Sequence, residues 1–248
     1  MSGLLVAGNF FIDRLNPQGQ SLGIFGPINM TKLSIKTEAE TKTRASRKKE
    51  SYGQALDDVK IAKPAEVSCE FDDQPSELLA MALMGKVVDL NEASGTVTDA
   101  AKTLPANQGW LELGHKNLAA EGLTVKQATT TLTLGTDFEI NYALGLIRSV
   151  KGGEVDAGGS ITVSYQHNAR SGKTIQGGIE SQVRARIFGE GTNLANGKAI
   201  ELEVYDVSLM PDKEIDFAAS EFVSGGLAGT AKLPAGKATP FTYTELDA

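Results

Sequence analysis

The sequence predicts a mainly β protein with one flanking α-helix and a small β module inserted in its middle. Glycine contributes 27 of the 248 residues. This is roughly 11%, compared with about 7% in average proteins, and it indicates many turns. Several segments alternate apolar and polar side chains, as half-buried strands do. A single segment, 74–85, has the spacing of an amphipathic helix. A chain of this length buries a sizeable core without disulfides or metals.

The clearest strands are predicted from alternation with a period of two residues. Residues 30–36, 65–72 and 181–188 each place apolar side chains on one face and polar ones on the other. Cys69 falls on an apolar face, so we interpret it as a small core residue and not as a nucleophile. In 200–209 the apolar phase slips by one residue, which predicts either a β-bulge or a strand that passes between two sheets. Glycines predict turns at 189–193 and 196–197.

The helix is predicted from its two ends. Asp73 or Gln74 is suited to cap it, Pro75 is suited to its first turn, and Gly85 ends it. Leucine and methionine side chains repeat at helical spacing between these ends. We expect the helix to pack on a sheet.

Residues 38–62 predict a long charged loop, because they are polar and have no apolar periodicity. A connection of this length inside a compact domain is usually functional or disordered. Five basic residues lie within eight positions of this loop: Lys42, Arg44, Arg47, Lys48 and Lys49.

Residues 88–170 predict an inserted small β-sandwich, similar in class to an immunoglobulin-like module. Short β-runs recur there at roughly ten-residue spacing, after a linker or weak strand that begins at Lys86. The predicted runs are 109–113, 130–134, 138–142, 146–150 and 160–165. We therefore expect residues 1–87 and 171–248 to form one domain around the insertion.

Composition and motifs disfavour an enzyme, a metal site or a cofactor site. The chain has one cysteine, two histidines and none of the common catalytic or phosphate-binding motifs. His115 and His167 are far apart in the sequence, and we expect each on a solvated turn or strand end and not in a proton relay. A net charge of −7 argues against wrapping nucleic acid.

We expect neither a membrane span nor a targeting segment. No apolar run approaches the ~20 residues that a membrane helix needs, and the first residues carry no basic start. This predicts synthesis and retention in a cytoplasm.

The charge distribution has two possible interpretations. The basic and acidic patches are either ordinary solvated surfaces, or they are complementary surfaces through which one copy of the chain binds the next. The basic loop at 42–49 contrasts with an acidic stretch over 201–221, in which we single out Asp212, Glu214 and Asp216. If these patches lie at opposite ends of the subunit, head-to-tail contact builds filaments. Nucleic-acid binding by the basic loop is a weaker alternative in so acidic a chain.

The features in their order resemble the major tail tube proteins of long-tailed bacteriophages. The series is an opening Gly8-Asn-Phe-Phe-Ile-Asp-Arg-Leu, a strand, a long charged loop, a second strand followed directly by a helix, and the closing segments 199–212 and 229–234. Residues 135–148 and 161–165 are similar to small β-modules of phage tail proteins.

The resemblance implies a tail-tube β-sandwich or half-barrel and a structural role in the virion. Six subunits would close a ring, and rings would stack head-to-tail around a tape measure protein, between a tail tip initiator complex and a tail terminator. Genomic DNA would pass through the lumen without specific binding, and no membrane would be a partner. Assembly would take place in the host cytoplasm.

The resemblance also implies roles for named residues. The long loop would reach the adjacent ring, so Lys42, Arg44, Arg47, Lys48 and Lys49 would make inter-ring contacts. An acidic lumen would repel phosphates, and Glu66 and Glu70, on the polar face of a core strand, are its candidates.

Three alternatives remain at this point. The first is the inner tube subunit of a contractile tail or a secretion-like system, because tube subunits look alike. The second is a surface or carbohydrate-binding sandwich using Trp110 and Tyr142, although Trp110 is better interpreted as a local core anchor. The third, an enzyme, lacks a visible cluster of titratable groups.

Overall fold

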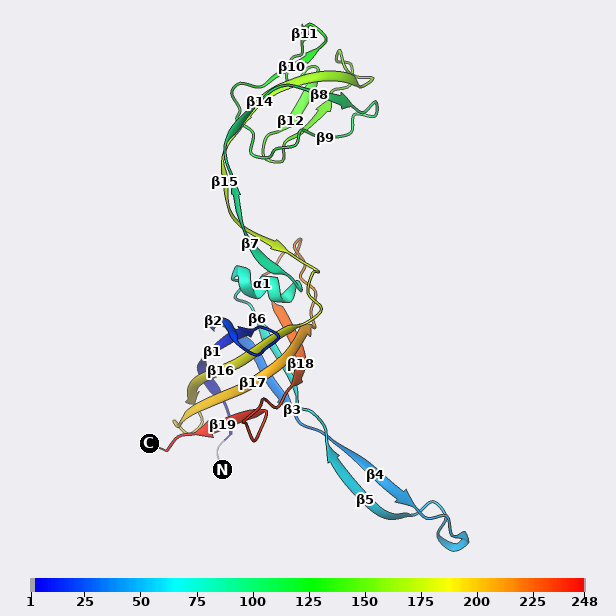
Figure 1. The fold of residues 1–248 in the computed structure, drawn as a ribbon, viewed down its shortest axis with the longest axis vertical. Helices are drawn as coiled ribbons and strands as arrows, with labels where there is room; N and C mark the ends of the chain where they lie inside the picture. Colours follow the sequence, from blue (N-terminus) through cyan, green and yellow to red (C-terminus); the bar gives the residue numbers. More distant parts are fainter. Residues whose placement is uncertain (1–2, 248) are drawn as a thin grey trace. The chain divides into compact units, whose positions relative to one another are not determined.

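The computed structural model describes residues 3–247 and is mainly β, with several antiparallel sheets and one short α-helix (Figure 1). The chain forms two compact units. The first joins Met1–Val88 to Ile175–Ala248, and the second is Asp89–Thr174. The second unit corresponds to the insertion predicted at 88–170. Residues 1, 2 and 248 of the predicted outer domain lie outside the described residues.

The first unit is built on an eight-stranded antiparallel sheet. Seven strands follow the order β2-β1-β16-β17-β18-β6-β3, and β19 pairs with β17 beside β18. Only Asn29 separates β2 from β3 in the chain, although they are the two ends of the order, so the sheet curls until its ends meet. The strands are β1 (Val6–Leu15), β2 (Ser21–Ile28), β3 (Met30–Lys36), β6 (Glu66–Phe71), β16 (Val183–Asn193), β17 (Ala199–Pro211), β18 (Gly225–Ala231) and β19 (Phe241–Glu245).

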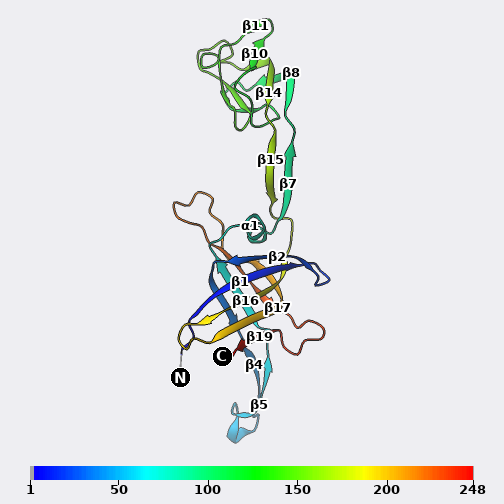
Figure 2. The ribbon, with the colours of Figure 1, turned by 90° about the vertical axis from the view of Figure 1, so that its left-hand side faces the viewer.

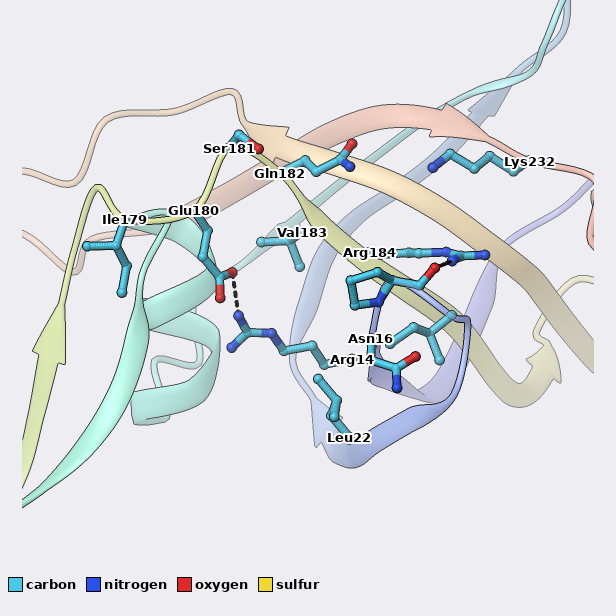
Figure 3. A pocket seen from close by; sticks show the side chains of 12 residues that line it. Arg14, Asn16, Leu22, Ile179, Glu180, Ser181, Gln182, Val183, Arg184 and Lys232 are labelled. Atoms are coloured by element: carbon cyan, nitrogen blue, oxygen red, sulfur yellow. Dashed lines mark hydrogen bonds and ion pairs between the residues drawn. The ribbon is translucent and has the colours of Figure 1, made fainter.

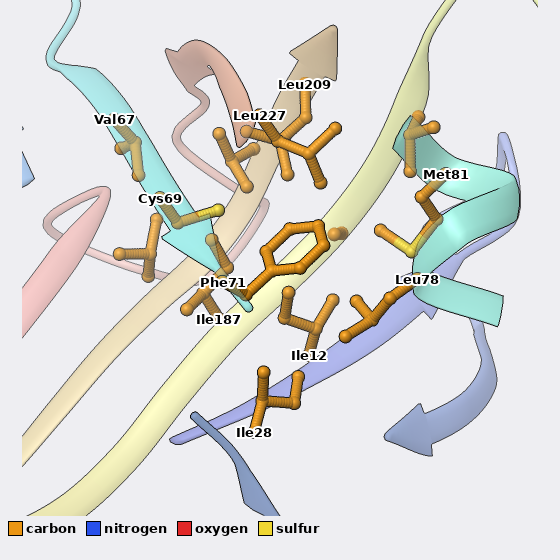
Figure 4. Close-up of a cluster of buried hydrophobic side chains, with 14 of the residues drawn as sticks. Ile12, Ile28, Val67, Cys69, Phe71, Leu78, Met81, Ile187, Leu209 and Leu227 are labelled. Carbon is orange, nitrogen blue, oxygen red and sulfur yellow. The ribbon is translucent and has the colours of Figure 1, made fainter. Parts of the chain in front are cut away.

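The core of this unit lies on the inner face of the curled sheet. The predicted alternation of β6 is confirmed, because Val67, Cys69 and Phe71 are all buried. Figure 4 shows the Phe71 ring in the middle of the cluster, among side chains from several strands and from the helix. The predicted strand at 30–36 is confirmed as β3.

Helix α1 (Ser76–Ala82) covers this core and is shorter than predicted. Leu78 and Met81 are fully buried against the sheet. The predicted side-chain cap is wrong: Pro75 occupies the cap position without a side-chain bond, and the Gln74 amide instead donates to the Val223 carbonyl at 3.1 Å. Gly85 does end the helix, since its N–H binds the Ala80 carbonyl at 2.7 Å.

The bulge predicted near 204–206 is confirmed, whereas the turn predicted at 189–193 is wrong. Ala185 pairs with Val207, but Ile187 pairs with Val204, so β17 contains an extra residue there. β16 continues to Asn193 and pairs with β1 along its length. A Cβ on Gly189 would collide with the Phe10 ring of β1. Close strand approach therefore explains this glycine.

Residues 38–62, predicted as a long charged loop, form an exposed β-hairpin. Strand β4 (Ala39–Ala45) pairs with β5 (Ala55–Ala62), and a short 3-10 turn (Lys49–Ser51) lies near the tip. Every residue of both strands is exposed. No face is buried within the subunit, and apolar alternation is limited to Val59 and Ile61, which is too short to reveal two strands in the sequence.

The second unit contains two small antiparallel sheets around its own core. One has the order β11-β10-β14-β8 and the other β12-β13-β9. Tyr165, Ile147 and Val163 are among its fully buried side chains. The strands are β8 (Gly95–Leu104), β9 (Leu111–Glu112), β10 (Thr124–Gln127), β11 (Thr130–Thr131), β12 (Phe138–Asn141), β13 (Leu146–Ser149) and β14 (Gly159–His167).

A two-stranded ladder joins the segments that cross between the units. β7 (Lys86–Glu92) pairs with β15 (Arg170–Gln176). Of the two predicted possibilities for this segment, a linker or a weak strand, the structure has the strand. In residues 3–247, no helix is long and apolar enough to cross a membrane.

Candidate assembly surfaces

One face of the hairpin of β4 and β5 carries both apolar and charged side chains. Residues opposite each other in an antiparallel pair share a face, and Lys42 lies opposite Val59 while Glu40 lies opposite Ile61. Val59 and Ile61 are 57% and 45% exposed. Arg44 falls on the same face, opposite Asp57. This face therefore combines exposed aliphatic side chains with two of the five predicted basic residues.

The hairpin tip is ordered by its own hydrogen bonds. The Ser46 amide donates to the Gln54 carbonyl at 2.7 Å, and the Gly53 amide returns a bond to the Ser46 carbonyl at 2.9 Å. The Ser46 and Ser51 hydroxyl oxygens are 2.7 Å apart and share a hydrogen bond, and Ser46 is buried. The three remaining predicted cations lie around this turn with exposed side chains: Arg47, Lys48 and Lys49.

The predicted acidic residues lie on an exposed segment between β17 and β18, residues 212–224, which we call the acidic loop. Asp212, Glu214 and Asp216 are all exposed. Phe217 and Phe222, which were not among the predicted surface residues, are exposed on the same segment, Phe217 at 77% and Phe222 completely. Phenylalanines between carboxylates, without strand or helix periodicity, were the available signal.

Glu66 and Glu70 lie on the polar face of β6, as expected, but lysines accompany them. Glu70 accepts hydrogen bonds from Lys213 Nζ at 2.6 Å and Lys32 Nζ at 3.0 Å. These two bonds hold the pKa of Glu70 below its ordinary value. Lys36 Nζ lies 3.8 Å from a Glu66 oxygen. The face is thus a set of ion pairs and not a uniformly acidic surface.

A pocket of about 450 Å³ opens between the β1–β2 turn and residues 179–184 (Figure 3). We call it the β1–β2 pocket. Arg14 forms an ion pair with Glu180 across one side of it. On the other side, Arg184 Nη1 donates to the Pro17 carbonyl at 2.5 Å. Its remaining wall includes Leu15, Leu22, Ile179, Val183 and Lys232.

The second unit holds the aromatic residues considered for a glycan site. Trp110 is 44% exposed, and the Arg148 guanidinium lies 4.7 Å from the centre of its ring. The interpretation of Trp110 as a core anchor is therefore wrong: a cation covers one of its faces. Tyr142 packs against the core of the unit.

His115 is exposed in a segment outside the strands and His167 ends strand β14, in keeping with the expected turn or strand-end positions, but the two side chains also lie together. Their rings stack with centroids 4.1 Å apart and an interplanar angle of 9°. His115 Nδ1 is 2.9 Å from the hydroxyl of buried Tyr165, which also bonds to the Leu113 carbonyl. Strand β14 and the 113–118 segment bring these residues together, which spacing in the sequence does not reveal.

Cys69 is confirmed as a core residue. It is fully buried, and burial raises its pKa to about 12. In the described residues, no group of three or more histidine, cysteine, aspartate or glutamate side chains is arranged to hold a metal ion.

Comparison with known proteins places the chain in a family. No curated protein matches it. One family model matches residues 4–240, and this match runs through both units. The chain therefore belongs to the family described as protein of unknown function UCP028589.

Proposed function

We propose that the chain is a structural, non-enzymatic subunit of the tail tube of a long-tailed bacteriophage. Hexameric rings of it would stack head-to-tail around a tape measure protein, between a tip complex and a terminator. Genomic DNA would leave through the lumen of the finished virion tail. The proposal starts from the order of sequence features, and the exposed hairpin of β4 and β5 supports it most directly.

The hairpin has the properties of an element that needs a partner. Its strands pair only with each other in the described part of the chain. A lone two-stranded hairpin is at best marginally stable in water. Val59 and Ile61 gain nothing from burial within the subunit, since both stay exposed. A neighbouring copy that covers this face would supply the missing apolar contact.

Open strand edges in the first unit also favour assembly. Within residues 3–247, β3 pairs only with β6, β2 only with β1, and β19 only with β17. Unpaired edge backbone is a template for pairing with another chain. Closure of a ring across subunits would satisfy such edges without any new fold.

The ion pairs around Glu66 and Glu70 suit a wall past which DNA slides. Phosphate binding depends on cations that are free to replace counterions. Lys32, Lys36 and Lys213 each already contact a carboxylate. A lumen lined by this face would therefore hold phosphates weakly, in keeping with passage without specific binding.

Charge reversal at the hairpin tip tests the proposal. The double variant Arg47→Glu with Lys48→Glu should fold normally but fail to form tubes, because the tip would repel an acidic neighbour. Negative-stain electron microscopy and sedimentation of purified protein would measure assembly. The matched control reverses two exposed lysines of the second unit, Lys116→Glu with Lys151→Glu, and should assemble as the parent does.

Two results would contradict the proposal. One is parental tubes of normal length from the Arg47→Glu, Lys48→Glu variant. The other is a parent protein that forms neither rings nor tubes at any concentration.

A further inference from the structure

We infer that the acidic loop of one copy docks in the β1–β2 pocket of the next copy and forms the contact between neighbours within a ring. This inference rests on the proposed function, because it names a contact of that assembly. The occupant of the pocket is a second copy of this chain, because two surfaces of the first unit are complementary in apolar character and in charge.

The acidic loop offers an apolar group that the subunit does not use. Phe217 and Phe222 are large aromatic side chains left in solvent. Burial of apolar area contributes about 25 cal/mol per Å², so two exposed rings on one segment favour a contact that removes them from water. Carboxylates flank the rings at Glu214, Asp216 and Glu221, and all three are exposed.

The β1–β2 pocket offers the opposite pattern. Its aliphatic side chains Leu22 and Ile179 are 60% and 57% exposed. Three cations line it: Arg14 is paired with Glu180, Arg184 is paired with Asp206, and Lys232 is left to meet an incoming carboxylate. Lys232 is exposed and its ammonium forms no ion pair with any described residue. The volume of about 450 Å³ falls in the range that encloses small organic groups.

Helix α1 holds the two surfaces at its two ends. Gln74, just before the helix, donates to the Val223 carbonyl of the acidic loop at 3.1 Å. Met84, just after the helix, accepts hydrogen bonds from the Ile179 and Glu180 amides of the pocket wall, both at 2.9 Å. The helix is anchored in the core through Leu78, so Val223 at the end of the loop and residues 179–180 of the pocket wall are held at the two ends of one helix.

Because the acidic loop and the β1–β2 pocket lie apart on the subunit, the proposed contact joins two different patches on two copies. Figure 2 shows the turn between β1 and β2 on the opposite side of this unit from the segment between β17 and β18. A copy therefore does not fill its own pocket with its own loop. Contacts between two different patches of identical chains generate rings when the rotation closes.

A second hollow in this unit fits the loop less well. It lies between β3 and the β17–β19 pair, and it is lined by Leu33, Ile35 and Tyr243 among others. Its one cation, Lys32, is already bound to Glu70. An acidic segment gains no charge contact there, whereas the β1–β2 pocket supplies one.

Cysteine cross-linking tests the contact directly. The native Cys69 is buried, so cysteines introduced at the surface react alone. A Ser220→Cys chain, changed at an exposed position of the acidic loop that leaves both rings in place, is mixed with an Ile179→Cys chain. Treatment with a short bismaleimide should give a covalent dimer. One chain carrying both changes should give a ladder of covalent oligomers. Leu194→Cys replaces Ile179→Cys in the matched control, because Leu194 is 59% exposed but lies outside the pocket.

Two further variants test the chemistry of the contact. Phe217→Ser with Phe222→Ser removes the rings and should leave folding unchanged, since neither ring is buried. Lys232→Glu places a carboxylate against the acidic loop and should weaken self-association at least about tenfold. Both variants should lower the cross-linking yield to that of the Leu194→Cys control.

The outcomes separate this inference from the proposed function. Rings or tubes without cross-linking above the control overturn the docking contact and leave the tube proposal standing. Cross-linking with assemblies that are neither rings nor tubes supports the contact and overturns the tube. Absence of both, at concentrations where the protein is soluble, overturns both.

Discussion

Arg184 on β16 donates two hydrogen bonds to the carboxylate of Asp206 on β17. Nε donates to Oδ1 at 2.8 Å and Nη2 donates to Oδ2 at 2.5 Å, and the Asp206 side chain is only 4% exposed. The bulge between Ala185 and Ile187 lies beside this pair. Because Arg184 also binds the Pro17 carbonyl, one side chain ties the bulged ladder to the wall of the β1–β2 pocket.

Removal of the Asp206 carboxylate should destabilise the first unit. We expect Asp206→Ala to lower the free energy of unfolding by about 2–3 kcal/mol, because two charge-assisted bonds are lost and the guanidinium loses its partner. Urea denaturation would measure the change. The control Glu245→Ala breaks a solvent-exposed pair with Lys198 and should change stability far less. Equal effects from the two variants would contradict the buried role of Asp206.

Separate cores should make the two units respond separately to core mutations. Leu78→Ala in the first core and Ile147→Ala in the second each empty a fully buried position. Each should cost about 2–5 kcal/mol, and calorimetry should show each lowering a different transition. Leu194→Ala, at an exposed site, should stay within about 0.5 kcal/mol of the parent. A single transition shifted equally by both core variants would refute the separation.

The apolar face of the hairpin should matter for assembly and not for folding. Val59→Ser with Ile61→Ser should leave the thermal midpoint unchanged, because both side chains are largely exposed. The same variant should abolish tubes in electron micrographs. Asp58→Ser with Lys60→Ser changes the opposite face of the same strand and should assemble. Loss of assembly in both variants would indicate that the strand as a whole, and not one face, makes the contact.

Acid should weaken the first unit partly through Glu70. Hydrogen bonds from Lys213 and Lys32 hold its pKa below the ordinary value of 4.5. A depressed pKa in the folded state contributes stability that is complete well above pH 4.5 and is lost as pH falls through the folded-state pKa. Thermal midpoints measured between pH 7 and pH 3 should therefore fall less steeply in Glu70→Gln than in the parent.

The matched control for acid sensitivity is Glu66→Gln on the same strand. Its nearest ammonium, Lys36 Nζ, is 3.8 Å away and is shared with Glu38. We expect this variant to retain most of the parental acid sensitivity. A profile for Glu70→Gln that matches the parent would show that its ion pairs contribute nothing measurable.

Sequence patterns predicted elements where one face is buried. β3, β6 and the first half of β16 alternate cleanly because their apolar faces contact the core. The slip in β17 was visible because both halves of the strand are packed. The hairpin of β4 and β5 was missed because neither of its faces is covered within the subunit. The glycines of β16 were misread as a turn because close backbone approach and turning select the same residue.

The charged residues of the candidate surfaces were predicted from the sequence, but the pocket and the contacts between distant segments were not. The basic and acidic residues could be named from the sequence because they are exposed and clustered. The β1–β2 pocket could not be, since Leu22, Ile179 and Lys232 meet only through sheet pairing between distant segments. The stacking of His115 on His167 was hidden for the same reason.

The single residue between β2 and β3 has a consequence for how the first unit folds. These strands occupy the two ends of the sheet order, yet Asn29 alone connects them. Neither end can fray far without displacing the other, so the sheet has no independent end from which unfolding could begin. Placement of Ser21–Lys36 is therefore expected to be a late, all-or-none step in folding, after β1, β6 and the strands between them have assembled.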